Sequence, residues 1–226
     1  MPFNIKKQWI RFWMRYAGLD FAGRIATKLA TLAAPPYYAR CYLARLNPNG
    51  YISPNATIYH NNMILGQNVF IGDRVVIYED KGGGIVKIGD KSHLYGDTTL
   101  QTGLGGSIDI DSNTHIHPRC QISAYRSNVV IGKDVQIAAN CAFYPYDHGI
   151  QGGVLIQEQP LTSKGDIIIE EDVWLGYGVK VLSGVHIGKG AVIGAGSVVN
   201  ENIADNGIAV GSPAKVKAFR RIKKIN

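Results

Sequence analysis

Residues 169–199 read IEEDVWLGYGVKVLSGVHIGKGAVIGAGSVV, and the spacing within this stretch decides the fold class. Aliphatic residues occupy every sixth position, and they are Ile169, Leu175, Val181, Ile187, Ile193 and Val199. A small or β-branched residue lies four positions after each of the first five. A period of six fits neither a helix, with 3.6 residues per turn, nor a strand, with a period of two. It is typical of a parallel β-helix, an all-β fold whose coils each contain three short strands and three turns.

The same spacing extends upstream and suggests the borders of the β-helix. A turn sequence, Asn47-Pro48-Asn49-Gly50, is followed by aliphatic residues at intervals of six, starting at Ile52. The longest interruption of the register runs from Tyr144 to Gly165. We therefore predict three parts: a helical segment at residues 1–47, the β-helix at 48–205 with a loop at 144–166, and a C-terminal cap at 206–226.

The charges of the 226-residue chain are unevenly distributed. Residues 1–47 contain eight Lys and Arg and one Asp, residues 48–214 contain ten basic and sixteen acidic residues, and residues 215–226 contain six basic residues and no acidic one. An acidic body argues against a nucleic-acid partner, because such proteins carry positive charge along the folded face. The basic ends favour anionic partners. Cys120 and Cys141 occupy the small-residue position of the repeat, so we expect them to be buried in a protein of a reducing compartment.

The N-terminal segment predicts two helices. In the first, Ile5, Trp9, Phe12 and Tyr16 follow a helical spacing, and basic residues fill the opposite face. The second runs from about residue 21 to residue 34 and ends at two prolines. The first helix has two interpretations: a membrane anchor lying among the lipid headgroups, or a helix that packs its aromatic face on the β-helix or on a neighbouring subunit. No apolar stretch of the segment is long enough to span a bilayer.

The C-terminal basic stretch, at about residues 215–224, is predicted to be a short helix or tail that covers the last coil. Without a cover, the end of a β-helix would present unpaired strand edges.

The longest interruption of the repeat contains the best candidate for acid–base chemistry. It begins Tyr144-Pro145-Tyr146-Asp147-His148-Gly149. Histidine can accept and return a proton near neutral pH, and Asp147 places a carboxylate next to it. Because the core of a β-helix is a scaffold, we expect function in the breaks of its register. His148, with Asp147, is therefore the predicted catalytic group.

Several motifs together resemble the hexapeptide-repeat acyltransferases, which have a left-handed parallel β-helix, and within them the maltose and galactoside O-acetyltransferase branch. The motifs are Ile131-Gly132-Lys133-Asp134-Val135, Asp147-His148, Asp172-Val173-Trp174-Leu175-Gly176, Ile193-Gly194-Ala195-Gly196-Ser197-Val198-Val199 and Val210-Gly211-Ser212-Pro213-Ala214-Lys215. The resemblance is good over residues 108–220, looser over 50–107, and absent from 1–47.

The resemblance implies a reaction and a role for particular residues. His148 would remove the proton of an acceptor hydroxyl, which attacks the thioester of acetyl-coenzyme A without an acyl-enzyme. Trp174 would lie near the thioester and the pantetheine arm, and Lys215 near the phosphates of the coenzyme. The coil positions that line the arm would be Gly176, Tyr177 and Ala195. No metal takes part.

The resemblance further implies a homotrimer with active sites between neighbouring subunits, and a carbohydrate acceptor. The longer, basic N-terminal segment resembles that of enzymes that O-acetylate capsule, exopolysaccharide or O-antigen units on lipid carriers. We therefore expect a cytoplasmic enzyme whose residues 1–47 contact the inner membrane face beside a lipid-linked acceptor.

Three alternatives remain open from the sequence. The first is an N-acetyltransferase that acts on an amino sugar or a nucleotide sugar. The second is a metal enzyme, because another branch of the same fold uses three histidines; His93, His115 and His117 are candidates, but the required third position is held by residues 120–122. The third is a non-catalytic β-helix that serves as a scaffold or binding module.

Overall fold

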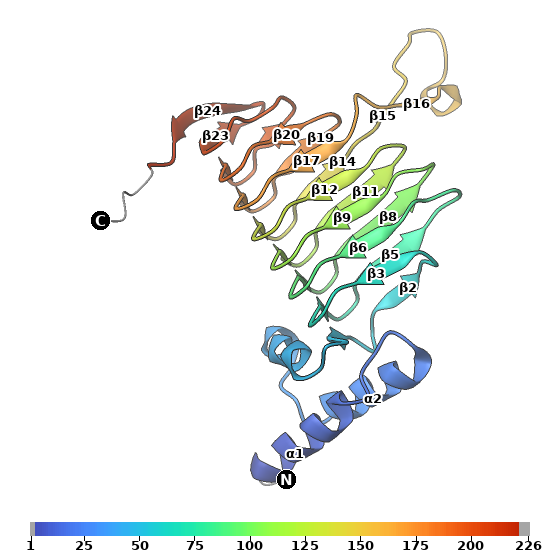
Figure 1. Ribbon diagram of the computed structural model, residues 1–226. Helices are drawn as coiled ribbons and strands as arrows, with labels where there is room; N and C mark the ends of the chain where they lie inside the picture. Colours follow the sequence, from blue (N-terminus) through green and yellow to red (C-terminus); the bar gives the residue numbers. More distant parts are fainter. Residues whose placement is uncertain (1–2, 222–226) are drawn as a thin grey trace.

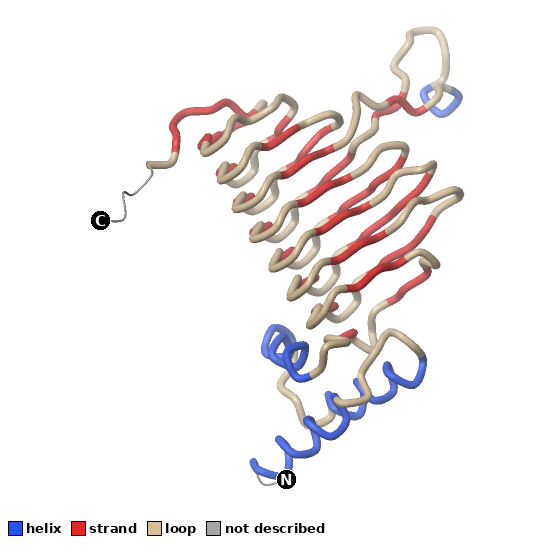
Figure 2. The backbone as a smooth tube through the Cα atoms, in the orientation of Figure 1, coloured by secondary structure: helices blue, strands red, loops and turns tan. Residues whose placement is uncertain are grey.

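The computed structural model describes residues 3–221, which form a helical cap and a long parallel β-helix (Figure 1). The cap consists of α1 (Phe3–Met14), α2 (Phe21–Thr31) and the 3₁₀ helix η1 (Tyr37–Leu46). The coils then stack away from these helices, so that the C-terminal strands lie at the far end (Figure 2). Within residues 3–221, no helix is both long enough and apolar enough to cross a membrane.

Three sheets, here named A, B and C, form the walls of the β-helix. Sheet A consists of β1 (Tyr51–Ile52), β4 (Phe70–Ile71), β7 (His93–Leu94), β10 (His115–Ile116), β13 (Gln136–Ile137), β18 (Trp174–Leu175), β21 (Val192–Ile193), β23 (Gly207–Gly211) and β24 (Ala214–Phe219). Sheet B consists of β2 (Thr57–Tyr59), β5 (Val76–Glu79), β8 (Thr99–Gly103), β11 (Gln121–Tyr125), β14 (Ala142–Tyr144), β19 (Lys180–Leu182) and β22 (Val198–Val199). Sheet C consists of β3 (Met63–Leu65), β6 (Val86–Ile88), β9 (Ile108–Ile110), β12 (Val129–Ile131), β17 (Ile167–Ile169) and β20 (His186–Ile187).

The six-residue spacing produces the core as predicted. Leu175 pairs with Ile193 in sheet A, and Val181 pairs with Val199 in sheet B, so one coil contains three hexapeptides. The six aliphatic residues of the 169–199 stretch are all at most 1% exposed. A column of such side chains removes apolar surface from water along the whole axis, which stabilises the stack. The predicted burial of Cys120 and Cys141 is also confirmed.

The cap contains the two predicted helices, but α1 does not pack its predicted aromatic face on the β-helix of its own chain. In α1 the buried face consists of Ile10 and Met14, which join a small core with Tyr51 and Phe70 at the end of the β-helix. Phe12 is 49% exposed. The first helix offers two apolar stripes, and only contact with the β-helix decides between them. The sequence also gave no indication of η1.

The C-terminal end differs from the predicted helix. Residues 214–219 form β24, which pairs antiparallel with β23 at the edge of sheet A. A strand satisfies the backbone groups that β23 would otherwise leave unpaired, which a helix could not do. The last residues of the predicted cap, 222–226, lie outside the described part of the chain.

Candidate functional site

Trp174 stands on the outer face of sheet A, at the end of a row of large side chains. Strand register places one outward residue of each coil above the next, in the order Tyr51, Phe70, His93, His115, Gln136 and Trp174. His93 and His115 stack with their ring centres 4.3 Å apart, and burial lowers the pKa of both. Trp174 is 53% exposed, so its indole remains available to a ligand.

In the neighbouring outward row, the side chains become smaller beside Trp174. This row runs through Tyr95 and His117 to Ala138, Gly176 and Gly194, whose amides bond from coil to coil. A Cβ on Gly176 would lie 2.7 Å from the amide nitrogen of Ala195, so only glycine fits there. A hollow beside Trp174 is lined by His117, Gln136, Ala138 and Ala139. We name this hollow, with the small residues that continue it, the Trp174 groove.

The turns between sheets A and B are here named the A–B corner. Beside Trp174, these turns change from polar side chains to glycines. In every turn after the first, which joins β1 to β2, one position has a positive φ, and it is occupied in chain order by Arg74, Asp97, Arg119, Asn140, Gly178 and Gly196. The first four side chains form a polar ladder, with an ion pair between Arg74 and Asp97 and a 3.0 Å bond from Arg119 to Asn140. A Cβ on Gly178 or Gly196 would meet only open space. Past Asn140, the corner therefore exposes bare backbone.

The structure brings three predicted coenzyme residues together at this corner. Gly176 packs against the backbone of Ala195, and the amide of Gly196 donates to the carbonyl oxygen of Tyr177 over 2.8 Å. The Tyr177 side chain is exposed. Lys215 lies on β24 opposite Val210, and its ammonium bonds to Glu201 over 2.7 Å. It is exposed, so a stronger anion could take the place of Glu201.

His148 and Asp147 lie on the long loop that leaves the corner between sheets B and C (Figure 1). They form β15 (Asp147–His148), which pairs antiparallel with β16 (Leu161–Thr162). Both side chains are exposed. Within one chain, the loop follows sheet B whereas Trp174 belongs to sheet A, so His148 and the Trp174 groove lie at different corners.

Hydroxyl groups fix the base of this loop. The Ser163 hydroxyl donates to the carbonyl oxygen of Pro145 over 2.6 Å, and the Ser183 hydroxyl donates to the same oxygen over 3.0 Å. Aromatic rings gather beside it: Tyr146 lies 5.5 Å from Tyr125 and 5.8 Å from Tyr144 between ring centres. The strand pair that carries His148 is therefore anchored at its root.

The tip of the loop is apolar and exposed. It includes η2 (Ile156–Glu158), and its exposed apolar residues are Ile150, Val154, Leu155 and Ile156. Soluble proteins rarely expose clustered apolar side chains on a loop without a binding role. The loop projects away from the β-helix of its own chain (Figure 2).

The histidines considered as metal ligands serve as packing groups in the row of sheet A. His117 stacks on Tyr95 with ring centres 4.9 Å apart, and burial lowers the pKa of His117. Among residues 3–221, no three His, Cys, Asp or Glu side chains converge as a metal site would require. The polar ladder of the A–B corner was missed from sequence, although its residues recur at intervals of 21 to 23.

Comparison with known proteins supports the fold, and the relatives that match are acetyltransferases. The family model described as bacterial transferase hexapeptide (six repeats) matches residues 166–201. A galactoside O-acetyltransferase of Lactococcus lactis subsp. lactis is 39% identical over 100 residues, which are 44% of this chain and 45% of that protein. The chain thus spans less than half the length of this curated relative.

Two solved structures are similar over most of the chain. The polySia-specific acetyltransferase NeuO has a TM-score of 0.62 and 27% identity, covering 76% of this chain and 75% of its own. AntD, an N-acyltransferase from Bacillus cereus, has a TM-score of 0.58 and 21% identity, covering 83% and 92%, and shares the fold. The repeat, the three-sheet stack and these matches agree with the predicted left-handed β-helix, and residues 166–201 carry the hexapeptide repeat of bacterial transferases.

Proposed function

We propose that the protein transfers an acetyl group from acetyl-coenzyme A to a hydroxyl of a sugar. The observation that carries the proposal is the Trp174 groove, where side chains shrink to alanine and glycine beside a half-exposed indole. A pantetheine arm is thin and rich in amides, so it needs exposed backbone at close range, which Gly178 and Gly196 provide. Trp174 would pack on the arm near the thioester, and Lys215 would meet the phosphates.

His148 would act as the general base. Its imidazole would take the proton of the acceptor hydroxyl while the oxygen attacks the acetyl carbon, and a new C–O ester bond forms. As the tetrahedral intermediate collapses, the C–S bond breaks and the proton passes from the imidazolium to the leaving thiolate. Asp147, the neighbouring residue on β15, is proposed to assist this base. Backbone amides of the neighbouring coil are candidates for stabilising the oxyanion.

This chemistry requires a second copy of the chain, since one chain holds His148 and the Trp174 groove at different corners. The loop with the exposed apolar tip is suited to reach a neighbouring β-helix, and burial of Ile150 and Leu155 there would stabilise the contact. We propose a closed ring of three such contacts, a homotrimer in which each site combines the base of one copy with the groove of the next.

The acceptor is proposed to be a unit of a polysaccharide precursor. Tyr125, Tyr144 and Tyr146 lie at the root of the His148 loop, and aromatic faces suit the C–H face of a sugar ring. A lipid-linked precursor would explain the cap: Phe12 is half-exposed and Phe21 is 83% exposed in a segment with eight basic residues. Apolar and cationic groups together favour an anionic membrane surface. The protein would thus contact the inner membrane face.

Acetyl transfer can be measured through the release of free thiol from acetyl-coenzyme A. We expect wild type to release thiol only when a sugar acceptor is added, and His148→Ala to lose this by roughly a hundredfold or more, as is usual for a missing general base. Analysis of the product by mass spectrometry and base lability separates an ester from an amide. Thiol release with amino sugars alone would favour an N-acetyltransferase, and full activity of His148→Ala would contradict its role.

A further inference from the structure

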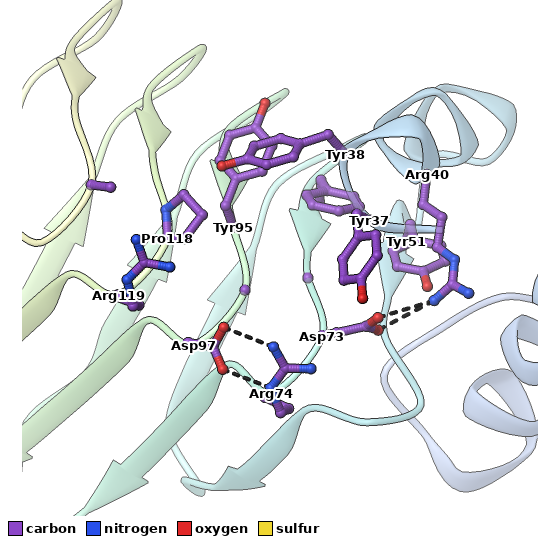
Figure 3. Close-up of a pocket in the computed structure, with 14 residues that line it drawn as sticks. Tyr37, Tyr38, Arg40, Tyr51, Asp73, Arg74, Tyr95, Asp97, Pro118 and Arg119 are labelled. Atoms are coloured by element: carbon purple, nitrogen blue, oxygen red, sulfur yellow. Dashed lines mark hydrogen bonds and ion pairs between the residues drawn. The ribbon is translucent and has the colours of Figure 1, made fainter. Parts of the chain in front are cut away.

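A second hollow of about 290 Å³ lies where η1 covers the A–B corner of the first coils (Figure 3). We name it the η1 pocket, and its principal residues are Tyr37, Tyr38, Arg40, Tyr51, Tyr95 and Arg119. Its volume is at the lower limit of small-molecule sites, so it suits one ring-sized group. The proposed reaction uses none of these residues.

One wall of the η1 pocket is aromatic. Tyr38 of η1 lies across Tyr95 of the β-helix (Figure 3). Their ring centres are 4.7 Å apart. Tyr37 is 70% exposed at the mouth and has a φ of 56°, an unusual conformation for a bulky residue outside the turns of the coils. Such a conformation costs free energy, and conformations of this kind cluster at active sites, ligand clamps and switch regions.

The opposite wall is polar, and its charges are nearly balanced. Arg40 bonds to Asp73 over 3.1 Å, and both side chains are less than a fifth exposed. Arg74 and Asp97 form a two-pronged ion pair with distances of 2.6 and 2.8 Å. Planar guanidinium and carboxylate groups held in this way still have free donors and acceptors at their edges.

A buried hydroxyl also faces the pocket. Tyr51 is fully buried, and its hydroxyl makes no hydrogen bond of normal geometry within residues 3–221, although Arg40 and Ser53 lie near it. Burial raises the pKa of Tyr51, so it remains a neutral donor. A buried hydroxyl without a well-formed hydrogen bond is costly in a native protein, and a small shift of the neighbouring side chains would let a ligand hydroxyl bond to it.

We infer that the η1 pocket binds a pyranose unit of the carbohydrate acceptor. A pyranose has an apolar face for Tyr38 and a rim of hydroxyls for Asp73, Arg74 and Tyr51. A diphosphate fits less well, because Arg40 and Arg74 are already paired with carboxylates. Of the three arginines of the pocket, Arg119 alone makes no ion pair with a carboxylate of residues 3–221, and it bonds to Asn140 instead. The guanidinium of Arg119 could pair with one negatively charged group on the sugar.

This inference rests on the proposed function and extends it to a remote sugar subsite. Ala139 lines both the η1 pocket and the Trp174 groove, so the two lie along one edge of the β-helix. A polymeric acceptor could be held at the η1 pocket while another of its units reaches the thioester. Binding energy from a remote unit would then position the reacting hydroxyl.

Saturation-transfer NMR tests the pocket without any chemistry. The probes are maltotriose, a short oligosialic acid and uridine diphosphate, each with purified wild type. We expect transfer from aromatic protons to the ring protons of at least one saccharide, with weaker binding of the diphosphate. Tyr38→Ala should weaken saccharide binding by roughly tenfold. Tyr42→Ala, which removes an exposed tyrosine from the same helix but outside the pocket, is the matched control and should bind normally.

Tyr51→Phe separates a ligand contact from a structural one. Loss of an unpaired hydroxyl should leave the melting temperature unchanged or higher, while saccharide affinity falls by roughly three- to tenfold. No transfer to either saccharide, tighter binding of the diphosphate, or unchanged affinity in Tyr38→Ala and Tyr51→Phe would overturn the inference. Titration with acetyl-coenzyme A tells the two proposals apart. Saccharide binding without coenzyme binding would refute only the proposed function. Coenzyme binding without saccharide binding would refute only this inference.

Discussion

Acidification from pH 8 to pH 5 is expected to destabilise the protein through the histidines of sheet A, and above all through His93. This side chain is 6% exposed and lies between Phe70 and His115 in the outward row. Burial, together with the nearby His115 and Arg45, lowers the pKa of His93 to about 4. An unfolded histidine has a pKa near 6.5 and binds a proton first, so the unfolded state gains from acid in this interval.

The size of the effect follows from the two pKa values. The pKa of His93 is near 6.5 in the unfolded chain and about 4 in the folded protein. The contribution of His93 to the free energy of unfolding is therefore complete above pH 6.5 and is lost as the pH falls towards 4. Between pH 8 and pH 5 this amounts to about 2 kcal/mol. His115 and His117 act in the same direction, because burial lowers the pKa of each. The carboxylate of Asp97, whose pKa Arg74 lowers, changes charge only at more acidic pH.

Urea denaturation at a series of pH values measures this loss. We expect the free energy of unfolding of His93→Phe to fall by about 2 kcal/mol less than that of wild type over the interval. Gln136→Phe adds a ring to the same row but keeps all three histidines, so it should retain the wild-type dependence. Equal stability of wild type at pH 8 and pH 5, or an unchanged slope in His93→Phe, would refute the reasoning.

Three further predictions concern the core, the site and the cap. Leu175→Ala leaves a cavity in the axial column and should cost roughly 2–5 kcal/mol of the free energy of unfolding, measured by denaturation. Mixing unfolded His148→Ala and Gly196→Asn chains and refolding them together should restore part of the thiol release that each lacks alone, if each site joins two copies; no recovery in properly formed mixed oligomers would contradict the shared site. Phe12→Ser with Phe21→Ser should reduce sedimentation with phosphatidylglycerol vesicles, whereas Tyr59→Ser, on an exposed strand of the β-helix, should not; equal sedimentation of both variants would contradict a membrane role for the cap.

The coils could be predicted from sequence because their determinant is local. Leu175, Val181 and Ile187 are six residues apart and belong to sheets A, B and C in turn. The register of the stack can therefore be predicted from the interval alone, without knowledge of distant contacts. The two ends could not be predicted equally well. Residues 214–219 form a strand because β23 offers an open edge, and α1 buries Ile10 and Met14 because the end of the β-helix meets that side.

The candidate site shows the same limit. Motifs in the sequence predict His148, Trp174 and Gly176 as site residues, and the structure places Gly176 beside Ala195. The sequence does not reveal that His148 and Trp174 lie at different corners of one chain, because the answer depends on which sheet each hexapeptide joins. Tyr38 carries no motif at all, and it became a candidate only because η1 lies across Tyr95.

The most direct test of the proposed function is calorimetric titration of acetyl-coenzyme A into wild type, His148→Ala and Gly196→Asn. Asparagine tolerates a positive φ, and the chain itself uses it at Asn140, so Gly196→Asn should fold while its side chain covers the bare backbone of the A–B corner. We expect wild type and His148→Ala to bind with similar affinity, and Gly196→Asn to bind about tenfold more weakly or worse. No binding to wild type at a coenzyme concentration that saturates a micromolar site would contradict the account.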